Sequence, residues 1–205
     1  VSQLVGGALL AVVAVLLGEP LPPATDLLWG AVAGLAGLSG IIAFYRGLAD
    51  GRMGIVSPMA AVVTAIIPVM FGLWSAGLPG APQLAGFGVA LLAVWLISRG
   101  DSVSRPRPRD IGLGLFAGIG FGIFFVVIGH TSHEAVFWPL VAARATSLCT
   151  LLLFMLATRR RISATPDQWL LMALTGILDT SGNVLFALAA RAGRLDSPVR
   201  ADLEE

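Results

Sequence analysis

Two matching stretches decide how this chain is organised: "GLADGRMGIVSP" at residues 47–58 and "ALAARAGRLDSP" at residues 187–198. In each, a Leu-Ala pair precedes a Ser-Pro pair, and the second copy follows the first by 140 residues. Trp29 and Trp169 have the same offset, so the match extends upstream. Both stretches follow long apolar runs. The sequence therefore predicts two copies of one helical unit.

The composition indicates an integral membrane protein. Hydrophobic residues make up 57% of the 205 positions and charged residues only 12%, about half of the roughly 25% found in soluble domains. The apolar runs are continuous rather than alternating, which favours helices over a barrel. Seven runs have about the length that a bilayer requires: residues 3–18, 27–45, 55–77, 83–98, 111–129, 136–157 and 168–190. We therefore expect an all-α membrane protein with seven transmembrane helices.

The repeat predicts an inverted topology. The offset carries the second helix onto the seventh, five helices later, and an odd number reverses orientation in the membrane. Residues 1–98 would form a first repeat that is incomplete at its N-terminus, and residues 111–205 a second repeat truncated at its C-terminus. The polar linker "RGDSVSRPRPRD", residues 99–110, separates them. We expect a fragment that lacks about three of ten helices, without a signal peptide because no basic residue precedes the first run.

Three segments carry a family resemblance: "AFYRGLADGRMGIVSPMAAVVTAIIPV" at residues 43–69, "WPLVAAR" at 138–144 and "GILDTSGNVLFALAARAG" at 176–193. The chain resembles EamA-type transporters of the drug/metabolite transporter superfamily. It departs from them at residues 77–80, which read "GLPG" where the family has Leu-Gly-Glu. The resemblance implies a secondary transporter of small organic metabolites or drug-like solutes that works by alternating access.

The arginines predict the orientation. Nine of them lie in the loops at 46–54, 99–110 and 158–167, whereas the opposite loops hold three. The positive-inside rule predicts that the loops with nine arginines face the cytoplasm. We expect the protein to lie in the cell inner membrane. A ten-helix family member with both termini cytoplasmic would instead place the linker outside. We favour the charge count, because it is a property of this chain.

Asp179 is the strongest candidate for a functional residue, because a charge in the middle of a membrane helix is costly and seldom accidental. Thr175 and Asn183 lie four residues to either side, which predicts one shared helical face. Arg144 lies at a depth in the membrane between those of Asp179 and Asn183, so helix geometry allows an ion pair or a hydrogen-bonded cluster among them. Two interpretations remain: a structural ion pair between helices, or part of a substrate pathway.

Three further residues complete the predicted pathway. Pro68 lies in mid-helix, removes a backbone donor and frees the carbonyl of Thr64. A kink there would produce the broken helix that transporters use near the midplane, although packing alone also explains such a kink. Tyr45, together with Asn183, is expected to face a central cavity. Pro58 is expected in the first helical turn, where proline is tolerated.

Several other features are interpreted as structural. The small-residue stripes at Gly30 and Gly34 and at Gly114, Gly118 and Gly122 predict close helix packing. Cys149 is expected in the core. "HTSHE", residues 130–134, matches neither the HExxH nor the HxxEH order of metal ligands and lies in a predicted short loop, so we do not expect a metal site there.

The composition also excludes several function classes. All thirteen basic residues are arginine, so no lysine is present for a Schiff base or a phosphate-binding loop. The net charge of +1 indicates no nucleic-acid partner. We expect no catalytic residue and no cofactor, with a small-molecule solute and the lipid bilayer as partners and a homodimer left open. The alternatives are an intramembrane enzyme that uses Asp179 as an acid or base, and a non-transporting membrane scaffold fragment.

Overall fold

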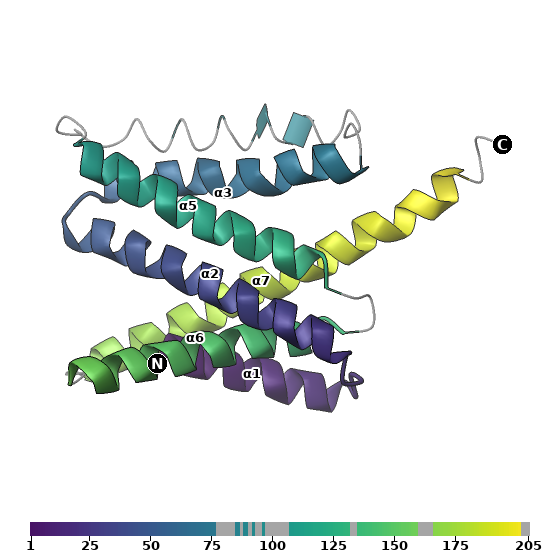
Figure 1. Ribbon diagram of the computed structural model, residues 1–205, viewed down its shortest axis with the longest axis horizontal. Helices are drawn as coiled ribbons and strands as arrows, with labels where there is room; N and C mark the ends of the chain where they lie inside the picture. Colours follow the sequence, from purple (N-terminus) through teal and green to yellow (C-terminus); the bar gives the residue numbers. More distant parts are fainter. Residues whose placement is uncertain are drawn as a thin grey trace. The chain divides into compact units, whose positions relative to one another are not determined.

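The computed structural model describes residues 1–76, 107–131, 135–159 and 166–201, with the single positions 85, 86, 88, 89, 92 and 96. In this part of the chain the secondary structure consists of six helices and no strand (Figure 1). The helices are α1 (Ser2–Leu16), α2 (Ala24–Ala49), α3 (Met53–Ala76), α5 (Pro108–Gly129), α6 (Phe137–Thr158) and α7 (Pro166–Ala201). The predicted helix at 83–98 lies almost wholly outside the described residues.

Five of these helices are long and apolar enough to cross a membrane. They are α2, α3, α5, α6 and the part of α7 from Asp167 to Ala189. The helix α1 is apolar but has 15 residues, fewer than the roughly 20 that a bilayer core requires. The predicted all-helical class is confirmed, and the five helices indicate a multi-pass membrane protein.

Glycines end the first two helices. Gly18, with φ +64°, and Gly51, with φ +70°, have the left-handed conformation that glycine adopts without steric strain. After α1, the amide of Glu19 donates to the carbonyl of Ala14 at 2.9 Å, and after α2 the amide of Arg52 donates to that of Gly47 at 3.1 Å. This is the Schellman arrangement, in which otherwise unpaired carbonyls of the last turn gain donors.

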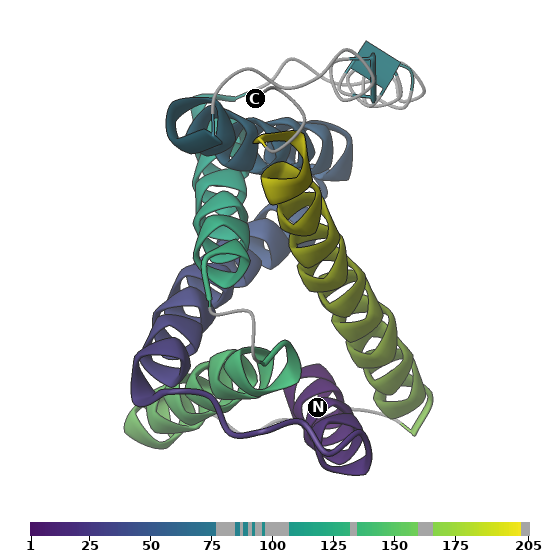
Figure 2. The same cartoon turned by 90° about the vertical axis from the view of Figure 1, so that its right-hand side faces the viewer.

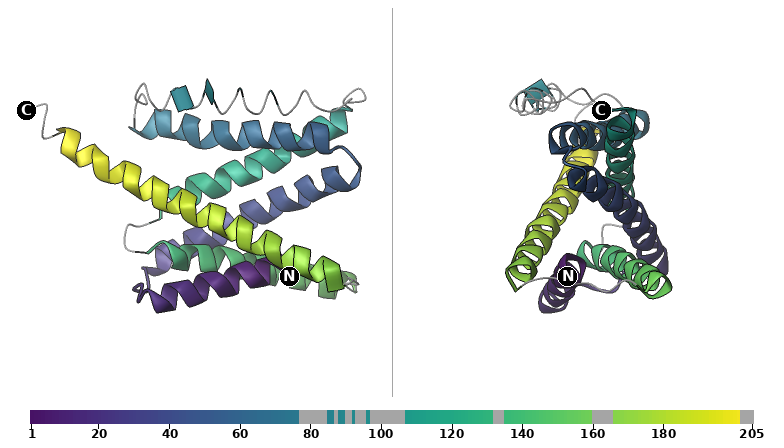
Figure 3. Two further views of the ribbon diagram at one scale, coloured as in Figure 1. Left: turned by 180° about the vertical axis from the view of Figure 1, so that it is seen from behind. Right: turned by 90° about the vertical axis from the view of Figure 1, so that its left-hand side faces the viewer.

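The helix α7 continues beyond the seventh apolar run. That run, residues 168–190, coincides with the part of α7 that is long and apolar enough to cross a membrane, Asp167–Ala189, and the helix continues without interruption to Ala201 (Figure 3). The repeat offset places Arg191 where the first copy has Gly51. An arginine enters the left-handed conformation at a higher energy than glycine, although Arg159 adopts it at the end of α6, with φ +51°. The two matching stretches form a turn in one copy and continuous helix in the other.

Two prolines lie inside α3, which nevertheless runs as one helix (Figure 1). The helix begins at Met53, so Pro58 lies in its second turn rather than in the first turn that we expected. The helix also continues through Pro68, and a kink there stays a prediction. Each proline removes only one backbone hydrogen bond, and a membrane helix tolerates this loss when neighbouring helices pack against it.

The chain divides into two compact units. Unit 1 comprises Val1–Leu35 and Val127–Glu205, and unit 2 comprises Ala36–Val126. The helix α2 contributes its first part to unit 1 and the remainder to unit 2. Each unit contains helices from both predicted repeats, so packing does not follow the repeat boundaries drawn from the sequence, which stay a prediction.

Unit 2 is held together by glycines of α5, as predicted. A methyl group on Gly114, Gly118 or Gly122 would lie only 2.5 to 2.9 Å from a side chain of α3. On its other side, α5 approaches α2 where Gly120 meets Gly40. The small core consists of Ala43, Ala60 and Ala117, with Phe44, Leu113 and Phe121 packed against it.

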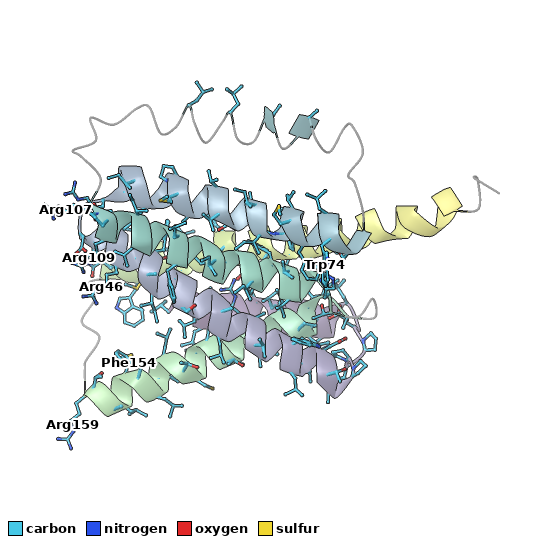
Figure 4. The ribbon with its side chains drawn as sticks, turned by 45° about the horizontal axis from the view of Figure 1, so that its top comes forward. Arg46, Trp74, Arg107, Arg109, Phe154 and Arg159 are labelled. Carbon is cyan, nitrogen blue, oxygen red and sulfur yellow. The ribbon has the colours of Figure 1, made fainter. Side chains whose placement is uncertain are left out.

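The arginines that the structure describes in unit 2 lie at one of its ends. Arg46, Arg107 and Arg109 lie at this end, whereas Trp74 lies at the other (Figure 4). Two ion pairs join the helix ends here, from Arg52 to Asp110 and from Arg109 to Asp50, each at 3.4 Å. This end therefore contains both the loop at 46–54 and the start of α5. The count of arginines assigned the loops at 46–54 and 99–110 to the same side of the membrane.

In unit 1, α1 lies between α6 and the first part of α7 (Figure 2). The start of α2 packs on α6, because Gly30 and Gly34 lie directly against the backbone of Pro139 and Ala143. Both predicted glycine stripes are thus packing surfaces. Cys149, expected in the core, is instead exposed on α6. The outward face of a membrane helix is as apolar as its packed face, so an apolar run does not identify the buried side.

Candidate functional site

Polar side chains from three helices of unit 1 meet around Arg144. Its Nη1 donates a hydrogen bond to Oε1 of Gln3 in α1 at 2.9 Å, and its Nη2 donates to Oδ2 of Asp179 in α7 at 2.5 Å. The second contact is also an ion pair. The predicted pairing of Arg144 with Asp179 is therefore confirmed, and Gln3 is a third member that the sequence did not reveal.

Close helix packing fixes the position of Arg144. It belongs to the buried face of α6, which comprises Pro139, Leu140, Ala143, Arg144 and Ser147. A Cβ atom on Gly7 of α1 would lie 3.2 Å from the Arg144 Cβ, so the backbone of α1 runs directly beside the arginine stem. The Ser147 hydroxyl donates to the carbonyl of Gly34 in α2 at 2.9 Å. These contacts hold the middle of α6 between α1 and α2.

The ion pair is buried at its cationic end and half-exposed at its anionic end. The Arg144 side chain is 9% exposed and that of Asp179 is 48% exposed. Residues 2–16, 137–158 and 168–189 contain no other charged side chain. An isolated charge in a low-dielectric setting is strongly unfavourable, so each of the two groups compensates for the other.

The neighbours of Asp179 along α7 differ in their surroundings. Thr175 is exposed and its hydroxyl donates to the carbonyl of Leu171 in its own helix at 2.8 Å. Asn183 is buried, at 8% exposure. Each step of four residues turns an α-helix by about 40° beyond a full circle, so Thr175 and Asn183 are about 80° apart. The predicted common face of these residues therefore runs from the exposed side of α7 to its packed side.

A second carboxylate organises the same unit at the start of α6. Glu19, in the turn after α1, accepts hydrogen bonds from the backbone amides of Val136, Phe137 and Trp138. The Trp138 indole Nε1 donates to the Glu19 carbonyl at 3.1 Å. A carboxylate is favourable at a helix N-terminus, where backbone N–H groups lack partners within the helix. This contact joins the end of α1 to the start of α6.

The other predicted pathway residues lie in unit 2. Tyr45 is half-exposed on α2, beside Phe44. The Thr64 hydroxyl donates to the carbonyl of Gly118 at 3.4 Å, which connects α3 to α5. Pro68 is partly buried within the continuous helix α3. Their part in a solute pathway stays a prediction.

Two site residues escaped the sequence analysis, although each left a signal. Gln3 is the only amide side chain in the apolar run at 3–18. Glu19 directly follows the glycine that ends that run. A polar residue in or beside a membrane helix requires a partner, which is the signal that would have identified both.

The site combines one cationic, one anionic and one neutral amide side chain. Arginine cannot serve as a general acid near neutral pH, and the Gln3 amide does not titrate. Among the described residues, no group of three or more His, Cys, Asp or Glu side chains is placed to hold a metal ion. Most of "HTSHE" lies outside those residues.

No protein-family model, curated protein or solved structure matches this chain.

Proposed function

We propose that this chain is part of a secondary transporter that moves small organic solutes across the cell inner membrane by alternating access, as its resemblance to EamA-type transporters implies. The observation that carries the proposal is the ion pair between Arg144 and Asp179, whose anionic end is half-exposed. Charged side chains within membrane helices commonly line substrate or ion pathways.

The unequal exposure of the pair favours a pathway over a purely structural role. A carboxylate facing lipid tails would be costly, so the exposed half of Asp179 requires water or another polar group. A water-filled path beside Asp179 satisfies this requirement, and Arg144 would then be the charge that a solute meets.

The same residues do not favour an intramembrane enzyme. Acid–base catalysis normally needs a second titratable group within hydrogen-bonding reach of the reacting atoms. The segments 2–16, 137–158 and 168–189 offer Asp179 no such partner besides Arg144. A membrane scaffold remains the rival, because it would need the ion pair only for stability.

Solute flux tests the proposal. The purified protein would be reconstituted into proteoliposomes and screened for uptake and counterflow of labelled metabolites. We expect saturable flux that is lost when Arg144→Met and Asp179→Asn are combined, while Asp167→Asn, in the first turn of α7, serves as the matched control. Absence of flux across the screen at normal membrane abundance would favour the scaffold.

A further inference from the structure

We propose that Arg144 binds the carboxylate group of a small anionic solute, which takes the place of Asp179 on the guanidinium group. This inference rests on the proposed transport function and names the chemical class of its solute. It also implies that a proton enters together with the anion.

The donors of Arg144 suit an incoming carboxylate. A guanidinium group presents five N–H donors in a planar fork that can engage both oxygens of one carboxylate. Asp179 uses a single oxygen, Oδ2, on Nη2, while the neutral Gln3 amide accepts from Nη1. A solute carboxylate that engaged the fork through both oxygens would make a stronger contact than Asp179 does.

Asp179 is the partner that can leave. Its side chain is 48% exposed, whereas that of Arg144 is 9% exposed. The contact between α1 and α7 is made by other residues, since Gly176 lies against Ser2 and Gly6 lies against Thr180. Asp179 can therefore release the guanidinium group while α7 stays packed on α1.

Charge balance determines what accompanies the solute. With Asp179 in place the pair is neutral, and a second carboxylate would leave a net negative charge in a low-dielectric setting. A proton taken from water onto the freed Asp179 carboxylate restores neutrality. Asp179 contacts Arg144 on α6, and Arg144 also donates a hydrogen bond to Gln3 on α1. The remaining titratable side chain in the segments 2–16, 137–158 and 168–189 is the Cys149 thiol, which is exposed.

Equilibrium binding tests the assignment with four probes. Benzoate and lactate, and their neutral amides benzamide and lactamide, would be titrated against the purified protein in nanodiscs. In Asp179→Asn the guanidinium lacks its counter-charge, so we expect at least about tenfold tighter binding of a carboxylate than in the unaltered protein, with no gain for its amide. Adding Arg144→Gln should remove this gain. Asp167→Asn changes the same charge elsewhere on α7 and should produce no gain.

Several results would overturn the assignment: equal binding of carboxylate and amide by Asp179→Asn, a gain that survives Arg144→Gln, or binding of inorganic phosphate without either carboxylate. If Asp179→Asn does not fold, the unaltered protein still decides. A pH electrode in weakly buffered solution should record uptake of about one proton per bound carboxylate. Carboxylate binding without proton uptake contradicts the exchange.

These binding measurements also separate this inference from the proposed function. Saturable flux of neutral solutes alone would refute the anion site and leave the transport function standing. Carboxylate binding with proton uptake, but without flux of any solute, would refute transport and leave the site.

Discussion

Separating Arg144 from Asp179 should destabilise the folded protein, and removing both should restore part of the loss. Asp179→Asn keeps the shape of the side chain and removes its charge. Arg144→Met removes the guanidinium group and retains the stem, which lies against Gly7 of α1. The double variant has neither charge. Asp167→Asn is the control, because it removes an exposed carboxylate from the first turn of the same helix.

The magnitude follows from the burial of each partner. Removing one member of a fully buried pair costs about 3 to 5 kcal/mol, because the other charge is left uncompensated. Asp179→Asn leaves a guanidinium that is 9% exposed. Since Asp179 was itself partly hydrated, we expect a loss of about 2 to 3 kcal/mol in unfolding free energy, below the fully buried range.

Removing the cation should lower the unfolding free energy less than removing the anion does. Arg144→Met leaves a carboxylate that is 48% exposed and can be hydrated more easily. We expect a loss of about 1 to 2 kcal/mol, which includes the hydrogen bond that Gln3 no longer receives. In the double variant neither charge is left alone, so the two partners should show a coupling free energy of about 1.5 to 2.5 kcal/mol.

Unfolding in mixed micelles of rising dodecyl sulfate content would measure the unfolding free energies of the unaltered protein, the two single variants and the double variant. If the two single losses add to within about 0.5 kcal/mol, the residues do not interact and the reasoning fails. Solute flux through the same variants then separates the two roles of the ion pair. A double variant that recovers stability without flux favours the pathway, whereas recovery of both favours a structural ion pair.

Three other outcomes are expected. Gly34→Ala would press a methyl group into the backbone of Ala143, so it should lower the unfolding free energy by about 1 to 3 kcal/mol. Gly72→Ala is the control and should cause no loss, because no atom lies within 4 Å of its Cβ position. Equal losses in the two variants would contradict the packing of Gly34 on Ala143. Glu19→Gln should cost about 1 kcal/mol, measured by thermal unfolding, because it removes the charge that caps α6, and an unchanged midpoint would argue against the cap. Cys149, which is exposed, should react with N-ethylmaleimide in the folded, detergent-solubilised protein, and protection until unfolding would contradict its position.

The amino-acid sequence was sufficient for the membrane class and for where most helices lie. Length and hydropathy place a helix in a bilayer without knowledge of its neighbours, because its backbone hydrogen bonds form within the segment. The predicted run at 111–129 lies within α5 and that at 27–45 within α2. The glycine stripes were also predictable, since close approach of two membrane helices requires small residues wherever it occurs.

Local similarity was a weaker guide to turns. The two matching stretches differ in structure, since α2 stops at Ala49 and α7 continues to Ala201. Gly51 has the left-handed conformation at the end of α2, and the second copy has Arg191 at the corresponding position. The inverted repeat itself stays a prediction from the sequence.

The sequence by itself determined that Arg144 and Asp179 need partners at similar depths, because a lone charge in a membrane helix is too unfavourable to leave uncompensated. Tertiary structure alone decided that Gln3 joins them, that Glu19 caps a helix more than a hundred residues later, and that Asp179 is the more exposed partner. These contacts join residues far apart in the chain. In a membrane the packed and lipid-facing sides of a helix are equally apolar, so helix packing, and not hydropathy, selects which side chains meet.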